Sequence, residues 1–236
     1  MLFSIITVSL NAENLISETL NSALNQTFND FEIIVKDGLS KDKTLDMIPN
    51  DDRIKIISKK DSGIYQAMNQ AISQARGQYL VFMNCGDRFY SNDVLDCVAK
   101  IIQKGGADII YGNRYSLSCG EIVYPSKVSK QFFYSSTICH QASFIKKELF
   151  EILGPYDEKL KIASDWKFFL EAKISGAKFL YCNKIFCWFL DGGVSESELG
   201  LRQGKNERKC VIKQKYNIFE RKIYNTIEKI SKVWCK

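Results

Sequence analysis

Short apolar runs alternate with amphipathic stretches along the first half of the chain. The runs have strand length and occupy residues 3–8, 31–35, 53–57, 79–83 and 108–111. The run at 79–83 is continuously apolar, which is typical of a strand buried on both faces. Helical spacing follows at 14–24, 64–75 and 93–104, and a cap at Ser40 or Asp42 predicts a further helix that ends at Ile48. This alternation predicts an α/β fold in which a mostly parallel sheet lies between two helical layers.

The second half of the chain has a less regular pattern. We expect strands at 141–145, 178–181 and 186–190, a helix that follows residues 164–166 and runs through Ile174, and a loop at 124–133. From Arg202 onward the chain is expected to be helical. The prediction is therefore one α/β domain over residues 1–201, followed by a helical tail over residues 202–236.

Polar residues gather where three of the expected strands end, at 7–11, 36–38 and 84–87. Ligands of parallel sheets bind beyond the carboxyl ends of the strands. The sequence therefore predicts a crevice that contains Asp37 and Asp87.

Each of these two carboxylates has two interpretations. Asp37 is either a turn residue before Gly38 or an acceptor of hydrogen bonds from a ribose or a base. Asp87 follows the most apolar strand, where a carboxylate suits a hard divalent cation. The alternative for Asp87 is a loop residue paired with Arg88.

Charge is distributed unevenly along the chain. The whole sequence has 33 Lys and Arg against 27 Asp and Glu, a net charge of +6. Residues 202–236 hold 11 basic and 3 acidic residues, so the tail carries +8 and the remainder −2. A nearly neutral domain argues against nucleic acid as its ligand. The basic tail, with its interspersed apolar residues, suits an anionic membrane surface, and the alternative is a helix packed on the domain or in a dimer.

Several classes of protein are excluded by motif. The eight cysteines form no C-x-x-C pair and His140 is the single histidine, so we expect no zinc site and free thiols in a reducing cytosol. The dinucleotide fingerprint, the P-loop and the G-x-S-x-G elbow are missing. No run reaches the roughly 18 residues that span a bilayer, and the apolar start lacks the basic region of a signal peptide.

Several segments in a fixed order resemble the family 2 glycosyltransferases of a branch that makes bacterial surface polysaccharides. Residues 3–11 are similar to the family's T-V-S-x-N strand, and 32–44 to its D-[DG]-G-S-x-D-x-T segment. Residues 61–69 are similar to D-x-G-I-Y-D-A-M-N, and 84–87 stand at the metal-binding D-x-D. Further similar segments are His140-Gln141, 154–157, 163–166 and 192–195.

The resemblance implies a GT-A fold that binds a nucleoside-diphosphate sugar, with a UDP-sugar expected. It assigns Asp165 as the general base for the acceptor hydroxyl and Asp87 as the ligand of Mn²⁺ or Mg²⁺. His140 and Gln141 would line the acceptor side or help to bind the pyrophosphate, and Trp166 would lie on the acceptor side. The residues assigned to the donor are Thr7, Val8, Ser9, Asn11, Asp37, Asp61, Gly63, Asn84, Cys85 and Gly86.

Two positions depart from the family's pattern. Cys85 and Gly86 stand where further acidic residues are usual, which leaves Asp87 as the one carboxylate of that motif. Gly38-Leu39 replaces the usual Asp-Gly or Gly-Gly after Asp37. The first departure predicts weak metal binding, and the second an unusual turn.

The implied reaction is a direct displacement that inverts the anomeric centre. It needs one base for the acceptor and one cation for the departing diphosphate, whereas a glycosidase needs a carboxylate pair. The acceptor would be a glycan or a lipid-linked saccharide, and the protein would be cytoplasmic, with its tail on the inner face of the membrane. Two alternatives remain: a nucleotidyltransferase, and a non-catalytic module that binds a nucleotide-sugar or a membrane.

Three of the residues assigned to the site also have a purely structural interpretation. Asp165 beside Ser164 could cap a helix. His140 could be a packed, hydrogen-bonded histidine, and Trp166 a core side chain.

Overall fold

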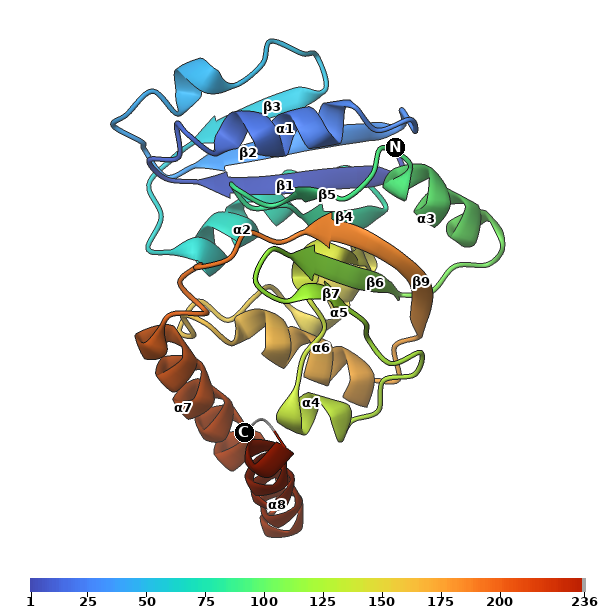
Figure 1. Ribbon diagram of the computed structural model, residues 1–236, viewed down its shortest axis with the longest axis vertical. Coiled ribbons are helices and arrows are strands. Elements are labelled where there is room, and N and C mark those ends of the chain that lie inside the picture. Colours follow the sequence, from blue (N-terminus) through green and yellow to red (C-terminus); the bar gives the residue numbers. More distant parts are fainter. Residues whose placement is uncertain (235–236) are drawn as a thin grey trace.

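The chain folds around a nine-stranded sheet (Figure 1). The computed structural model describes residues 1–234, with the side chains of residues 1–227. Its strands are β1 Phe3–Ser9, β2 Phe31–Asp37, β3 Ile54–Ser58, β4 Tyr79–Phe82, β5 Arg88–Phe89, β6 Ile109–Ser116, β7 Gly120–Ile122, β8 Ser143–Lys146 and β9 Phe179–Trp188. Its α-helices are α1 Ile16–Leu24, α2 Ile64–Ile72, α3 Val94–Gln103, α4 Phe132–Ser135, α5 Glu148–Leu153, α6 Ser164–Ile174, α7 Glu198–Lys215 and α8 Ile218–Trp234.

The first four long strands are parallel and confirm the expected α/β class. The sheet order is β3-β2-β1-β4-β8-β6-β9-β5, and β7 pairs with β6. In the register of β1, β2 and β3, Ser9 lies opposite Asp37, and Asp37 opposite Ser58. The three strands therefore end at the same edge, as ligand sites of parallel sheets require.

The second half of the sheet is mixed. Strand β8 is antiparallel to both β4 and β6, whereas β9 is parallel to β6. The two strands expected at 178–181 and 186–190 are one strand, β9, because β6 pairs with it both before and after an irregularity at residues 182–184. The register shifts beside Gly112, where a Cβ would lie 2.6 Å from the Lys184 carbonyl oxygen.

The prediction of a helix that ends at Ile48 is wrong. Only a short 3₁₀ turn, Leu45–Met47, forms there. The polar side chains that could have capped a helix instead bind the loop after β1: Thr44 Oγ1 accepts the amide hydrogen of Ala12, and Asp42 Oδ2 that of Glu13. The segment is therefore tied to its neighbouring loop and continues in a non-helical path.

The two C-terminal helices leave the domain on one side, at the bottom of Figure 1. Helix α7 begins at Glu198, four residues before the expected start at Arg202. It packs through buried Val211 and Ile212, and α8 places the Tyr224 ring 5.8 Å from Tyr134 of α4. The apolar tail side chains beyond residue 227, and residues 235–236 altogether, lie outside the description.

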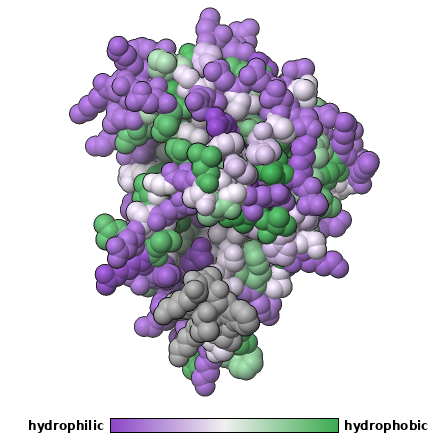
Figure 2. Space-filling view, viewed as in Figure 1, coloured by the Kyte–Doolittle hydropathy of each residue, from purple (hydrophilic) through white to green (hydrophobic). Residues whose placement is uncertain are grey.

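Polar side chains cover most of the face in Figure 2, with smaller apolar areas between them. Within residues 1–234, no helix combines the length and apolar character that crossing a membrane requires.

Candidate active site

The loops after β1 and β2 are joined to each other by side chains. Asn11, at φ 51°, donates its amide hydrogen to Ser40 Oγ at 2.8 Å and accepts the Lys41 amide hydrogen on Oδ1 at 2.9 Å. Asparagine tolerates this left-handed conformation better than most residues. Leu39 adopts φ 68°, which agrees with the expectation of an unusual turn after Asp37.

Asp37 supports this turn from inside. Its Oδ2 accepts the amide hydrogens of Leu39 and Ser40 at 2.9 and 3.0 Å, and the Ser58 hydroxyl at 3.2 Å. Its Oδ1 accepts the hydroxyls of Ser40 and Ser9. Burial raises the pKa of Asp37, but these hydrogen bonds outweigh it and hold that pKa below its usual value. With no exposed surface and its acceptor sites in use, Asp37 fits the turn interpretation better than contact with a nucleoside.

The end of β1 presents little side-chain surface. Thr7 is fully buried, and Val8 and Ser9 are 9% and 7% exposed. The hydroxyl of Thr7 has no hydrogen-bond partner among the described residues. Thr7 therefore has no surface for a ligand, and Val8 and Ser9 have little.

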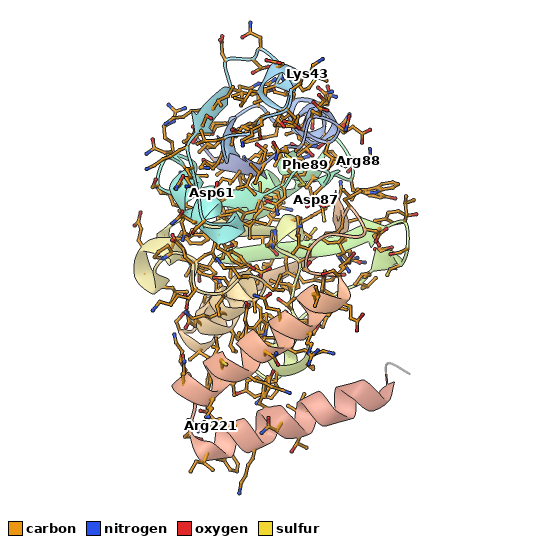
Figure 3. The ribbon with its side chains drawn as sticks, turned by 90° about the vertical axis from the view of Figure 1, so that its left-hand side faces the viewer. Lys43, Asp61, Asp87, Arg88, Phe89 and Arg221 are labelled. Carbon is orange, nitrogen blue, oxygen red and sulfur yellow. The ribbon has the colours of Figure 1, made fainter. Side chains whose placement is uncertain are left out.

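Asp61 is held by a buried lysine. Lys36, fully buried on β2, donates to Asp61 Oδ2 at 2.8 Å and to the carbonyl oxygens of Asp37 and Lys59 at 2.9 and 2.6 Å. All three ammonium hydrogens are thus used. Asp61 Oδ1 accepts the amide hydrogen of Gly63, whose φ of 142° few other residues adopt. Figure 3, which views the molecule from the side where β1 and β2 end, labels both Asp61 and Asp87.

A turn presents Asp87 at the end of β4. The Asp87 amide donates to the Asn84 carbonyl at 2.9 Å, and Gly86 has φ 97°. Asp87 Oδ1 accepts the Leu190 amide hydrogen at 2.9 Å, and Oδ2 accepts Gln141 Nε2 at 2.8 Å. Burial raises the pKa of Asp87 despite these two bonds.

The thiol of Cys85, in the turn after β4, is affected by the charges of Asp87 and Asp37. Burial raises the pKa of the Cys85 thiol to about 12, and the charges of Asp87 and Asp37 add to the effect.

His140 connects Asp165 to this turn. Its Nδ1 lies 2.9 Å from Asp165 Oδ2, and its Nε2 lies 3.2 Å from Asn84 Nδ2. The Asn84 amide donates to Nε2, so the imidazole hydrogen sits on Nδ1 and points at Asp165. Burial lowers the pKa of His140, but the hydrogen bond and charge of Asp165 outweigh it and raise that pKa. His140 and Asp165 lie 56 and 81 residues beyond Asn84 in the sequence, so only the fold brings the three side chains together.

Asp165 lies in the first turn of α6. Burial raises the pKa of Asp165. That effect is outweighed by interactions with His140, the Trp166 amide and the Tyr65 hydroxyl, so the pKa is lowered. The carboxylate is therefore ionised at neutral pH, as a general base must be. Asp165 does not cap α6, which begins at Ser164 after Ala163.

Gln141 and Trp166 differ in how they fit their expected places. Gln141 contacts Asp87, which agrees with its expected alternative on the pyrophosphate side. Trp166 has no exposed surface and donates its indole hydrogen to the Phe133 carbonyl at 2.6 Å. A ring without exposed surface cannot stack on a sugar, so the core interpretation of Trp166 is the one the structure supports.

Sequence reasoning missed four residues of this site. Tyr65 lies with its hydroxyl 3.0 Å from Asp165 Oδ1, and its signal was its place in the segment 61–69. The sequence placed Lys36 at a polar strand end but did not indicate its role. For Glu207 and Arg208 it gave no signal, because their partners come from distant segments. Arg208 stacks over Trp166 at 5.1 Å and makes no ion pair among residues 1–227, and burial lowers its pKa while Asp165 opposes that effect.

Asp87 fits a cation only in part. Within the described residues, no three His, Cys, Asp or Glu side chains gather closely enough to hold a metal ion. Each Asp87 oxygen has one protein donor and keeps acceptor capacity. Mg²⁺ is commonly held by one or two carboxylates, substrate phosphates and water. The donor set therefore suits a cation that arrives with a diphosphate.

The site also includes one small cavity. It measures about 30 Å³ and lies at the start of α2, between Gly63 and Lys161. That volume admits water but not a nucleotide.

Comparison with known proteins identifies the family. The model of "Glycosyl transferase family 2" matches residues 4–152, more than half of the chain. A PGL/p-HBAD biosynthesis glycosyltransferase of Mycobacterium bovis (strain BCG / Pasteur 1173P2) is 34% identical over 173 residues, which are 71% of this chain and 68% of the relative. Chondroitin synthase of Pasteurella multocida (strain Pm70) is 28% identical over 92% of this chain, but over only 23% of its own length.

Solved structures share the fold. S. aureus TarS 1-349 in complex with UDP-GlcNAc superposes with a TM-score of 0.77 at 21% identity, over 97% of this chain and 70% of that chain. The mannosyltransferase PcManGT from Pyrobaculum calidifontis, in complex with GDP-Man and Mn²⁺, gives 0.74 at 16% identity, over 96% and 68%. These similarities confirm the expected GT-A fold. With the family match and the relative at 34% identity, they identify the chain as a family 2 glycosyltransferase.

Proposed function

We propose that this glycosyltransferase moves one sugar from a UDP-sugar to a hydroxyl of a glycan or a lipid-linked saccharide, with inversion, in surface polysaccharide synthesis. The observation that carries the proposal is the His140 ring, which joins Asp165 to Asn84 in the turn that presents Asp87. This contact supports a single site that would contain both the base and the carboxylate for the cation on the diphosphate. The relatives named above, a PGL/p-HBAD biosynthesis glycosyltransferase and a chondroitin synthase, support the choice of acceptor class.

Asp165 is the base in this proposal. The acceptor oxygen attacks the anomeric carbon, the bond from that carbon to the diphosphate oxygen breaks, and the acceptor proton passes to an Asp165 carboxylate oxygen. The nucleoside diphosphate leaves with the electron pair. His140 and Tyr65 hold Asp165 in place, since each contacts a different carboxylate oxygen.

The donor would lie between Asp61 and the turn 84–87. Asp61 faces this side as a carboxylate fixed by Lys36, ready to accept hydrogen bonds from a base or a ribose. Arg208 is a largely desolvated cation near Asp165, and we assign it to the diphosphate charge. TarS with UDP-GlcNAc, a relative in fold, supports UDP as the nucleotide.

Asp87 would hold Mn²⁺ or Mg²⁺. A divalent cation supplies Lewis-acid stabilisation of the leaving diphosphate. Gln141 and the Leu190 amide would keep the Asp87 carboxylate oriented toward it. The Mn²⁺ complex of PcManGT supports metal use in this fold.

The test begins with a panel of radiolabelled UDP-, GDP- and TDP-sugars, with Mn²⁺ and an extract of bacterial lipids and glycans as the acceptor source. We expect incorporation from a UDP-sugar and a UDP-dependent rise in the melting temperature. Asp165→Asn should reduce transfer at least ~100-fold, because general base catalysis contributes about 10²–10⁴-fold. Its UDP-dependent thermal shift should match that of the wild type.

Three results would contradict parts of the proposal. Transfer that persists in Asp165→Asn would refute the base. Binding of the nucleotide without any transfer by the wild type would favour a non-catalytic module. Release of pyrophosphate with formation of a nucleotide-sugar would indicate a nucleotidyltransferase.

A further inference from the structure

Glu207 of α7 binds the three residues that lead into α6. Its Oε1 accepts the Lys161 amide hydrogen at 2.9 Å, and its Oε2 accepts those of Ile162 and Ala163 at 3.0 and 2.9 Å. Gln203, one turn earlier on α7, donates to Oε1 at 2.9 Å. One carboxylate thus fixes three consecutive backbone amides immediately before the helix that carries Asp165.

One of these three residues, Ile162, is also held by α2. The Tyr65 hydroxyl lies 2.7 Å from the Ile162 carbonyl oxygen and 3.0 Å from Asp165 Oδ1. Ile162 is therefore bound at its amide by α7 and at its carbonyl by α2. Helix α7 also approaches closely here, since a Cβ on Gly204 would lie 3.0 Å from Ile162 Cγ2.

This clamp, formed by Glu207 and Tyr65 on residues 161–163, determines the position of Asp165. A base works only within about 2.6–3.2 Å of the proton it removes, and a misplacement of about 1 Å can cost ~100-fold in rate. Hydrogen bonds to a carboxylate are stronger than neutral ones, and a negative charge near a helix N-terminus is favourable. Glu207 satisfies both conditions at the start of α6.

We propose that Glu207 is a positioning residue for Asp165, which makes α7 part of the catalytic unit. The proposal rests on the role of Asp165 in the proposed function. It gives the first half of the sequence-defined tail a task inside the enzyme, distinct from membrane contact.

The test compares Glu207→Gln with Glu198→Gln, the same substitution at an exposed position of α7 for which the structure shows no hydrogen bond or ion pair. Glutamine has one acceptor oxygen for three amides and turns an N–H₂ group toward the others. With the UDP-sugar selected above, kcat of Glu207→Gln should fall about 10- to 100-fold, with the donor KM within about 2-fold. Glu198→Gln should equal the wild type. Hydrogen–deuterium exchange should accelerate at 161–163 in Glu207→Gln alone.

A double-mutant cycle separates this inference from the proposed function. In an Asp165→Asn background, Glu207→Gln should cause no further loss, because a positioning residue has nothing left to position. An additional loss there, or an unchanged kcat in the single variant, overturns the role of Glu207. Full transfer by Asp165→Asn would instead refute the base and leave the clamp as a structural feature.

Gly204→Ala keeps the proposal testable if Glu207→Gln does not fold. Alanine favours helix over glycine, so α7 should remain intact. Its methyl group must move Ile162 by a few tenths of an ångström. We expect kcat to fall a few-fold with unchanged UDP binding, and a wild-type kcat together with unchanged exchange at 161–163 would contradict the proposal.

Discussion

Strand β2 carries three charged side chains into the interior, Glu32, Lys36 and Asp37, each at most 1% exposed. A buried charge is tolerated only when hydrogen bonds replace its water. Lys36 binds three oxygens and Asp37 accepts from three serines and two amides, as described above. Glu32 accepts from the Ser4 hydroxyl at 2.7 Å and from the amide and Nε of Arg76 at 2.6 and 2.9 Å. Lys36 and Asp37 stabilise the strand ends from which the site is built, whereas Glu32 holds the opposite end of β2.

Glu32→Gln tests this at the residue scale. Burial raises the pKa of Glu32, but its bonds to Arg76 and Ser4 outweigh it and lower that pKa below 4.5. A lowered folded-state pKa means that the stabilisation is complete above about pH 4.5 and is lost as the pH falls through the folded-state value. We expect the variant to lose about 1–3 kcal/mol of unfolding free energy at pH 7 and less at pH 3.

Urea unfolding at both pH values measures the difference. Glu151→Gln, at an exposed position, is the matched control and should change stability little at either pH. If Glu32→Gln lost more unfolding free energy at pH 3 than at pH 7, the expected pH dependence would be contradicted.

At the scale of elements, helix α2 assembles the site by docking on a distant segment. Asn69 donates to the Tyr156 carbonyl and accepts the Tyr156 amide hydrogen, both at 2.9 Å. Tyr65 contacts Ile162 and Asp165 one turn earlier. The segment 61–69, recognised in the sequence by its resemblance, therefore acts as the support on which 154–165 is built.

The junction between α2 and β4 has no room for a side chain. A Cβ on Gly77 would lie 2.4 Å from the backbone of Phe3 and Ser4 in β1. Because backbone cannot move aside as a flexible side chain does, Gly77→Ala should destabilise the protein by about 3 kcal/mol. Gly193→Ala is the control, because a Cβ there meets nothing within 4 Å. If thermal unfolding gave the same melting temperature for both variants, β1 and β4 could separate without loss of stability.

At the scale of the whole molecule, basic charge is concentrated on the C-terminal helices. Exposed apolar residues occur there too: Ile218 and Phe219 of α8 are each 71% exposed. We expect the protein to sediment with vesicles that contain phosphatidylglycerol but not with pure phosphatidylcholine. Between about 10 mM and 1 M salt, the Debye length falls from about 30 to 3 Å, and binding should fall with it.

A matched pair of charge variants identifies the surface. Replacing the exposed tail residues Lys205, Lys213 and Lys222 by Gln should weaken vesicle binding. The same change at Lys41, Lys104 and Lys127 removes equal charge from the exposed surface of the domain and should weaken it less. Equal losses in the two variants would assign the effect to net charge alone.

Much of this protein follows from local pattern. Apolar runs and amphipathic stretches predicted β1, β2, β4, α2 and α6, because burial on one or two faces leaves a period in the sequence. The family, and with it Asp87 and Asp165 as candidates, followed from short segments in a fixed order. The helix expected to end at Ile48 failed because Asp42 and Thr44 bind another loop, and such long-range hydrogen bonds leave no period.

The tertiary structure decided which of these residues act together. Asp37 is buried because five hydrogen-bond donors from three strand ends surround its carboxylate. Trp166 is a core side chain because α6 packs over Phe133. Asn84, His140, Asp165 and Glu207 lie far apart in sequence and meet only through the sheet order and the docking of α2 and α7. Sequence determines which side chains are available, whereas the position of a base to within an ångström depends on contacts between segments that no local pattern records.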